Sequence, residues 1–165
     1  MSAVVRTDKM FATDNRAGLV SVRYQPDDVI TEIDNGNVVK LAGLEEGSRE
    51  VFKGETPAAN DAIENIVLVA SPEVMYDERL RNLDDFTNAK GSIARGYHLH
   101  VNDIFSVTKE ALVGVETPAI GNVVELAAGT KLNVAESATD GATLIGKIVD
   151  INVVGRYTYY AIQVA

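Results

Sequence analysis

The feature that most constrains the fold is a run of β-branched and alternating apolar residues that recurs along most of the chain. Gly, Asn, Asp or Pro separate these runs, among them GLVSVRYQ, DVITEID, NVVKLAG, NIVLVAS, DIFSVT, NVVELAAG and YTYYAIQV. Short strands with turn residues at this spacing are typical of all-β domains rather than of alternating strands and helices. We therefore predict a mainly β fold, a single antiparallel β-sandwich or barrel-like domain, for which 165 residues are enough.

One segment has a helical pattern instead. In YDERLRNLDDF, the residues Leu80, Leu83 and Phe86 follow one another at steps of three. This spacing predicts a short helix at about residues 77–87, which would cap a sheet edge.

Turn residues and alternation predict the local layout at three places. Asn35-Gly36 favours a two-residue hairpin with Ile33 opposite Val38, because both central positions of a type I′ turn need positive φ. VVELAAGTKLNV predicts a second hairpin, with Gly129 in the left-handed conformation. The last residues, YTYYAIQV, predict a strand that is built into the sheet.

The composition changes near residue 17. Residues 1–17 lack sustained alternation and predict an extended N-terminal arm, followed by a β-rich body at 18–165 with a candidate internal boundary near 54–64. The arm is basic, with Arg6, Lys9 and Arg16, and has Met10 and Phe11 as its apolar residues. The rest is acidic, and the net charge is −9.

Charge and residue types exclude several classes of function. An acidic body does not favour nucleic acid, and the absence of cysteine removes disulfides, thiol nucleophiles and thiolate metal sites. No apolar run is long enough for a signal peptide or a membrane helix, so we expect synthesis in the cytosol and no membrane partner.

Both histidines lie in GYHLHV, where a strand would project His98 and His100 from one face. Cupin barrels present two imidazoles in this way, but they add a glutamate and a third histidine. Here the nearby carboxylate, Asp103, would lie on the opposite face of a regular strand, and there is no third histidine. Two half-exposed structural histidines are the preferred interpretation, and no metal or cofactor is predicted.

Other catalytic patterns are weak. There is no glycine-rich phosphate loop, G-x-S-x-G elbow or H-E-x-x-H pair. Thr139-Asp140-Gly141 favours a simple turn, and the paired acids, such as Asp84-Asp85, are interpreted as solvated surface. No enzymatic activity is predicted.

Three stretches resemble small structural proteins of tailed bacteriophages, the head decoration, cement or head-fibre proteins. They are NGNVVKLAGLEEGSREVFKGETPA, the region from IVLVASPEVMY to HVNDIFSVTKEAL and, more weakly, GNVVELAAGTKLNVAES. The resemblance covers most of residues 18–165 in order. It implies a protein without cofactor or reaction that attaches to the outside of a capsid, with the major capsid protein as its partner. We expect the protein in the host cytoplasm during assembly and on the outer surface of the capsid in the finished virion.

Two further expectations follow for such a protein. The arm would be the capsid anchor, through Arg6, Lys9, Met10, Phe11 and Arg16, with basic residues for steering and apolar ones for residence time. A homo-oligomer is expected, with a trimer favoured, because several weak contacts with a lattice reinforce one another.

Two alternatives from other classes remain open. A carbohydrate-binding or adhesive β-module on a virion would need exposed aromatic residues as stacking platforms, and the chain has no tryptophan. A small cupin-like metalloprotein would need a third ligand beside the two histidines.

Overall fold

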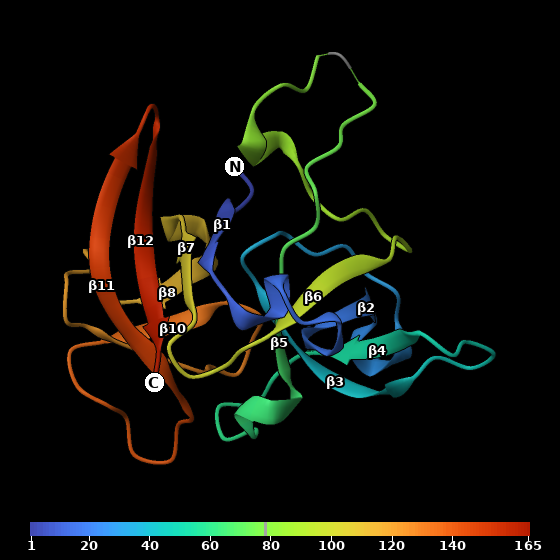
Figure 1. Cartoon of the computed structure of the whole chain (residues 1–165), viewed down its shortest axis with the longest axis horizontal. Coiled ribbons are helices and arrows are strands. Elements are labelled where there is room, and N and C mark those ends of the chain that lie inside the picture. The colour runs from blue at the N-terminus through green and yellow to red at the C-terminus, as the bar shows by residue number, and fades with distance from the viewer. Residues whose placement is uncertain (78) are drawn as a thin grey trace.

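The computed structural model describes residues 1–77 and 79–165 and is mainly β, with 41% strand and 11% helical residues. This content confirms the predicted fold class, because ordinary globular domains have about a third of their residues in helices. The strands form two groups that lie side by side, a curved open sheet and a small barrel (Figure 1).

The open sheet has seven strands in the order β1-β7-β12-β11-β9-β10-β8. Neighbouring strands in this sheet run antiparallel, except β8 and β10, which run parallel. The strands are β1 (Val5–Lys9), β7 (Ile104–Val107), β8 (Leu112–Gly114), β9 (Val123–Glu125), β10 (Leu132–Ala135), β11 (Leu144–Val154) and β12 (Tyr157–Val164).

The barrel is closed by five strands in the order β2-β4-β3-β5-β6, in which β2 and β4 run parallel. They are β2 (Leu19–Tyr24), β3 (Val38–Leu44), β4 (Val51–Glu55), β5 (Ile66–Val69) and β6 (Ala94–His98). Two glycines allow so small a barrel to close. A Cβ on Gly54 would lie 2.8 Å from a methyl of Val22, and one on Gly96 would lie 2.9 Å from a methyl of Val67.

The alternation of strand residues divides the core into two clusters. Val39 and Val67 belong to the smaller cluster, together with Val22, Ile33, Val69 and Ala94. Their neighbours Val38 and Leu68 belong to the larger cluster, which also holds the buried residues of the open sheet, such as Phe105 and Ile162. The barrel and the open sheet therefore share the larger cluster.

The candidate boundary near 54–64 falls at the connection between β4 and β5 of one barrel. These two strands lie on either side of β3, and the connection is hydrogen-bonded to loops of the open sheet. The amide of Gly129 donates to the carbonyl of Pro57 over 3.2 Å, and that of Thr143 donates to the carbonyl of Ala59 over 2.7 Å. The chain passes from barrel to sheet later, after β6.

The N-terminal segment is extended, but it is not an arm outside the body. β1 forms an edge of the open sheet and pairs antiparallel with β7, Val5 opposite Val107. Ala3, Val4, Met10 and Ala12 are also buried, along with Val5. The sequence conceals this strand because its partner lies about a hundred residues away and a register shift interrupts its alternation.

Among the residues that the structure describes, the predicted short helix at about 77–87 is reduced to a single 3-10 turn. One 3-10 turn, Leu83–Asp85, is present there, and residue 78 lies outside the described residues. Five more 3-10 turns are found elsewhere in the described chain: Phe11–Thr13, Arg16–Gly18, Pro26–Asp28, Ile63–Asn65 and Lys109–Ala111. Leu80 and Leu83 are exposed, so no packing against a sheet supports the helical pattern.

The predicted hairpins have different outcomes. β9 and β10 form the second one, but Gly129 does not have the positive φ that we expected. The first is wrong: Asn35-Gly36 is a turn, yet Ile33 bridges to Asn88 and Val38 pairs with Leu68. The C-terminal strand is confirmed as β12, which lies between β7 and β11.

Candidate functional site

The five residues predicted as a capsid anchor separate into buried and exposed groups. Met10 is only 3% exposed and belongs to the core. The guanidinium of Arg6 lies over the ring of Tyr159, 4.1 Å from its centroid, and 3.6 Å from the carboxylate of Asp8. Both side chains therefore serve the packing of β1 on the sheet.

Lys9, Phe11 and Arg16 are exposed, and we call them the N-terminal corner. Phe11 begins one 3-10 turn and Arg16 the next, and the amide of Asn15 donates to the carbonyl of Phe11 over 3.1 Å. The ring of Phe11 remains 50% exposed. The corner therefore combines two cations with one aromatic side chain on an ordered piece of backbone.

The corner is fixed by the region of the two histidines. The ring of Phe11 packs on that of His100, with centroids 4.6 Å apart, and its amide donates to Asp103 over 2.7 Å. The strand β6 ends at His98, and a turn containing Asn102, with φ of 72°, then reverses the chain. Asp103 thus comes within 3.8 Å of the ring of His100 instead of lying on the opposite face.

Within the described ranges, no cluster of three or more His, Asp or Glu side chains could hold a metal ion. Burial lowers the pKa of His98, and the neighbouring His100 lowers it further. The neutral form of His98 is therefore favoured in the fold.

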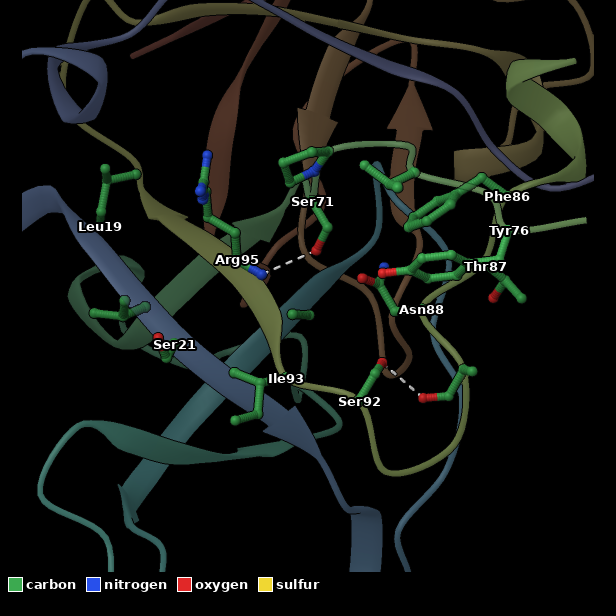
Figure 2. A pocket seen from close by; sticks show the side chains of 15 residues that line it. Leu19, Ser21, Ser71, Tyr76, Phe86, Thr87, Asn88, Ser92, Ile93 and Arg95 are labelled. Atoms are coloured by element: carbon green, nitrogen blue, oxygen red, sulfur yellow. Dashed lines mark hydrogen bonds between the residues drawn. The ribbon is translucent and has the colours of Figure 1, made fainter. Parts of the chain in front are cut away.

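An open groove of about 660 Å³ lies between the barrel and a long connection. We call this connection, residues 71–77 and 79–93, the crossing segment. Figure 2 shows Leu19 and Ile93 on one side of the groove and Tyr76 and Phe86 on the other. The ring of Tyr76 is 97% exposed. The groove therefore offers apolar and aromatic surface to solvent.

Asn35 holds two parts of the crossing segment in place, one at Ser71 and one at Asn88. Its side-chain amide donates to the carbonyl of Ser71 over 2.8 Å, and its side-chain oxygen accepts from the amide of Ser71 over 2.9 Å. The same oxygen accepts from the side chain of Asn88 over 3.0 Å. Asn35 is buried, so these hydrogen bonds explain why the Asn35-Gly36 turn is not the tip of a hairpin.

The crossing segment is tethered at two more places. Asp84 is buried, not solvated as predicted, and accepts from the hydroxyl of Tyr157 over 2.7 Å and from Arg156. These contacts join it to the turn between β11 and β12. The hydrogen bond from Tyr157 lowers the pKa of Asp84, and Arg156 acts in the same direction.

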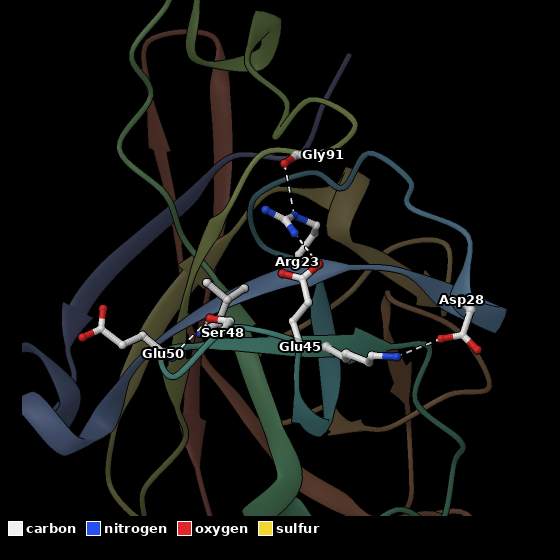
Figure 3. A network of polar contacts seen from close by, with 8 residues as sticks. Arg23, Asp28, Glu45, Ser48, Glu50 and Gly91 are labelled. Atoms are coloured by element: carbon white, nitrogen blue, oxygen red, sulfur yellow. Dashed lines mark hydrogen bonds and ion pairs between the residues drawn. The ribbon is translucent and has the colours of Figure 1, made fainter.

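The other tether joins the end of the segment to the barrel. Arg23 of β2 donates to the carbonyl of Gly91 over 3.2 Å and pairs with Glu45 (Figure 3). Nearby, Lys53 of β4 pairs with Asp28 over 3.1 Å. The groove thus has a fixed frame, although its rim is exposed.

A further buried carboxylate, Glu125, serves the structure. It accepts from Asn133 over 2.8 Å and from the hydroxyl and amide of Thr139 over 2.6 and 3.0 Å. Burial acts to raise the pKa of Glu125, but these hydrogen bonds outweigh it and lower the pKa. The predicted turn at Thr139-Asp140-Gly141 is confirmed and is thereby fastened to β9.

Sequence reasoning missed the groove. The residues that frame it, Asn35, Ser71 and Asn88, are far apart in the chain and meet only through side-chain hydrogen bonds. Tyr76 gave a signal, an aromatic residue in a stretch without alternation, but exposure cannot be deduced from the sequence.

Comparisons with known protein families, curated proteins and solved structures found no match to this chain. None of the described helical segments has the length and apolar character required to span a membrane.

Proposed function

We propose that the protein is a non-enzymatic structural protein that decorates and stabilises the outer surface of a tailed-phage capsid. The proposal rests on the resemblance of the three stretches, which together cover most of residues 18–165 in order, to decoration proteins. A mainly β fold with a net charge of −9 is compatible with this role, because such a surface stays soluble and avoids packaged DNA.

The partner in this proposal is the major capsid protein, and the contact is the N-terminal corner. Lys9 and Arg16 supply positive charge in an otherwise acidic protein, and Phe11 supplies an apolar group that is half exposed. Met10 leaves the proposed contact because it is buried, and Arg6 leaves it because its guanidinium lies over the ring of Tyr159. A homo-oligomer, with a trimer favoured, would repeat the corner at a threefold position of the lattice.

The test is to mix the purified protein with undecorated capsids of its own phage and to measure binding. Saturable, stoichiometric binding is expected. Phe11→Ala should mainly raise the dissociation rate, whereas Lys9→Gln and Arg16→Gln should slow association at low salt.

Matched controls use exposed residues away from the corner. Ile120→Ala removes a side chain that is 63% exposed, and Lys131→Gln removes an exposed charge. Both should bind like the wild type. Binding that Phe11→Ala leaves unchanged would refute the corner, and failure of the wild type to bind would refute capsid decoration.

The exposed Tyr76 favours a second candidate, a carbohydrate-binding or adhesive module on a virion. Sugar rings stack on aromatic faces, and Tyr76 lies at the rim of the groove with Phe86 beside it (Figure 2). A glycan array decides this point: binding that Tyr76→Ala abolishes would support the module, and an array without signal would contradict it.

A further inference from the structure

The strand β11 has an outer edge that is only half paired. Away from β12, it pairs with β9 at Leu144–Lys147, and the backbone of Ile148 bonds with Gly121 and Asn122 over 2.8 and 2.9 Å. For residues 149–154, no backbone partner on this side exists in the described part of the chain. In Figure 1, β11 and β12 extend together beyond the other strands of the open sheet.

The turn after β11 shows which backbone groups are free. Gly155, with φ of 60°, and Arg156 join Val154 to Tyr157, as in a two-residue turn with glycine first. In such a hairpin the closing pair exchanges both hydrogen bonds, and the direction then alternates along the strand. The N–H and C=O groups of Ile151 and Val153 therefore point outward.

This edge lacks the features that usually prevent strands from pairing. Natural proteins protect exposed edges with lysine, proline or bulges. Residues 150–154 read DINVV, with one charge at Asp150 and with Val153 68% and Val154 47% exposed. The bulge in β11 lies between Ile148 and Asp150, at the start of the free part, and Asp150–Val154 pair with β12 without a further register shift.

We propose that this edge pairs antiparallel with the same edge of a second copy of the chain, about a twofold axis at Asn152. Ile151 then lies opposite Val153 of the second copy, and their outward groups exchange hydrogen bonds. Asp150 lies opposite Val154, so that no like charges face each other. A register centred one residue earlier, at Ile151, would place Val154 of the second copy beside Ile148. That side of Ile148 is already hydrogen-bonded to Gly121 and Asn122.

The occupant is a second copy because the edge is complementary to itself. Apolar residues meet apolar residues, and Asp150 comes near Arg156 of the second copy, at the diagonal position two residues beyond Val154. Arg156 pairs with Asp84 of its own chain, but its side chain remains half exposed. So short an edge buries less than the roughly 1,200 Å² of a stable interface, so the pair forms at high protein concentration or on a crowded surface. The contact is independent of the proposed function and additional to any threefold arrangement.

Single cysteines test the register, because the natural chain has none. Asn152→Cys places two thiols opposite each other at a non-hydrogen-bonded pair, where Cα atoms are about 4.5 Å apart, within the range of a disulfide. Asp150→Cys, on the same strand, places its two thiols about four residues out of register, which is too far. Under a mild oxidant, Asn152→Cys should form disulfide dimers at least about tenfold faster than Asp150→Cys.

A second variant tests the hydrogen bonds. Val153→Pro removes an outward N–H without removing a bond to β12. Added to Asn152→Cys, it should slow dimer formation to the level of Asp150→Cys; Val101→Cys, at another valine that is 68% exposed, sets the background rate. If circular dichroism shows that the proline variant is unfolded, Val153→Lys replaces it.

Equal rates for Asn152→Cys and Asp150→Cys, or dimer formation that neither Val153 variant slows, would overturn the proposal. Capsid binding measured separately with the cysteine-free protein distinguishes this failure from a failure of the proposed function.

Discussion

Met10 and Phe11 are neighbours in sequence, but they lie in opposite environments, and this difference gives the sharpest test of the N-terminal structure. Met10 is 3% exposed and belongs to the larger core cluster, whereas Phe11 is 50% exposed and contacts His100. If the N-terminal segment is part of the core, truncating Met10 must destabilise the whole domain. Truncating Phe11 must cost much less.

The expected magnitudes follow from burial. Met→Ala in a packed core costs about 2–5 kcal/mol, from lost transfer free energy and from the cavity left behind. For Phe11, half of a fully buried side chain contributes about 1 kcal/mol. The ring contact with His100 adds about 0.5–1.5 kcal/mol.

Thermal unfolding followed by circular dichroism measures both variants. For a domain of this size, 1 kcal/mol shifts Tm by about 2–4 °C, so Met10→Ala should lower Tm by about 4–20 °C. Phe11→Ala should lower it by about 3–10 °C. Deleting residues 2–16 should destabilise the protein more than Met10→Ala, because β1 and its pairing with β7 are lost as well.

Two results would refute this reasoning. One is a Met10→Ala variant that melts with the wild type. The other is a truncated protein, without residues 2–16, that keeps the Tm of the full chain. Either would mean that β1 is not part of the stable sheet and that the free arm expected from the sequence is correct.

Three further predictions concern buried or half-buried polar groups. The folded state lowers the pKa of Asp84 below its ordinary 3.8, so the stability that its ionised form contributes is lost as pH falls below about 4. In urea unfolding, Asp84→Asn should therefore lose less stability than the wild type over this pH range. Glu125→Ala should lower the free energy of unfolding by about 1.5–3 kcal/mol at pH 7, measured in urea, since three donors lose a charged acceptor; an unchanged midpoint would contradict this. The folded state lowers the pKa of His98, so the unfolded chain takes up a proton first as pH falls below about 6.5 and the free energy of unfolding declines. His98→Gln should show a flatter dependence of this free energy on pH between about pH 7.5 and 5.5 than the wild type. An identical dependence in both proteins would argue against this reasoning.

The period-two pattern of the strands predicted the fold class because that information is local. In NVVKLAG and NIVLVAS, alternate residues face the barrel interior and the shared core, and the same alternation correctly indicated β12. Such runs must be strands wherever their partners lie.

The sequence could not predict how distant segments meet. Asn35-Gly36 has the residues of a hairpin turn, but three hydrogen bonds from the buried side chain of Asn35 to Ser71 and Asn88 determine its surroundings. Asp84 resembles a surface acid until Tyr157 and Arg156 approach it from the other end of the chain. In both cases a long-range contact outweighs the local preference.

The N-terminal corner differs physically from the free arm that the sequence indicated, and the difference bears on how it would bind a capsid. A disordered arm loses conformational entropy when it binds, about 1–2 kcal/mol for each backbone residue that becomes fixed. In the corner, the pairing of β1 with β7 and the hydrogen bond from Phe11 to Asp103 have already fixed the backbone. Three exposed side chains can therefore contribute to affinity without the loss that a free arm would incur. The same preorganisation limits their reach, so in the proposed complex the corner itself would have to face the capsid surface.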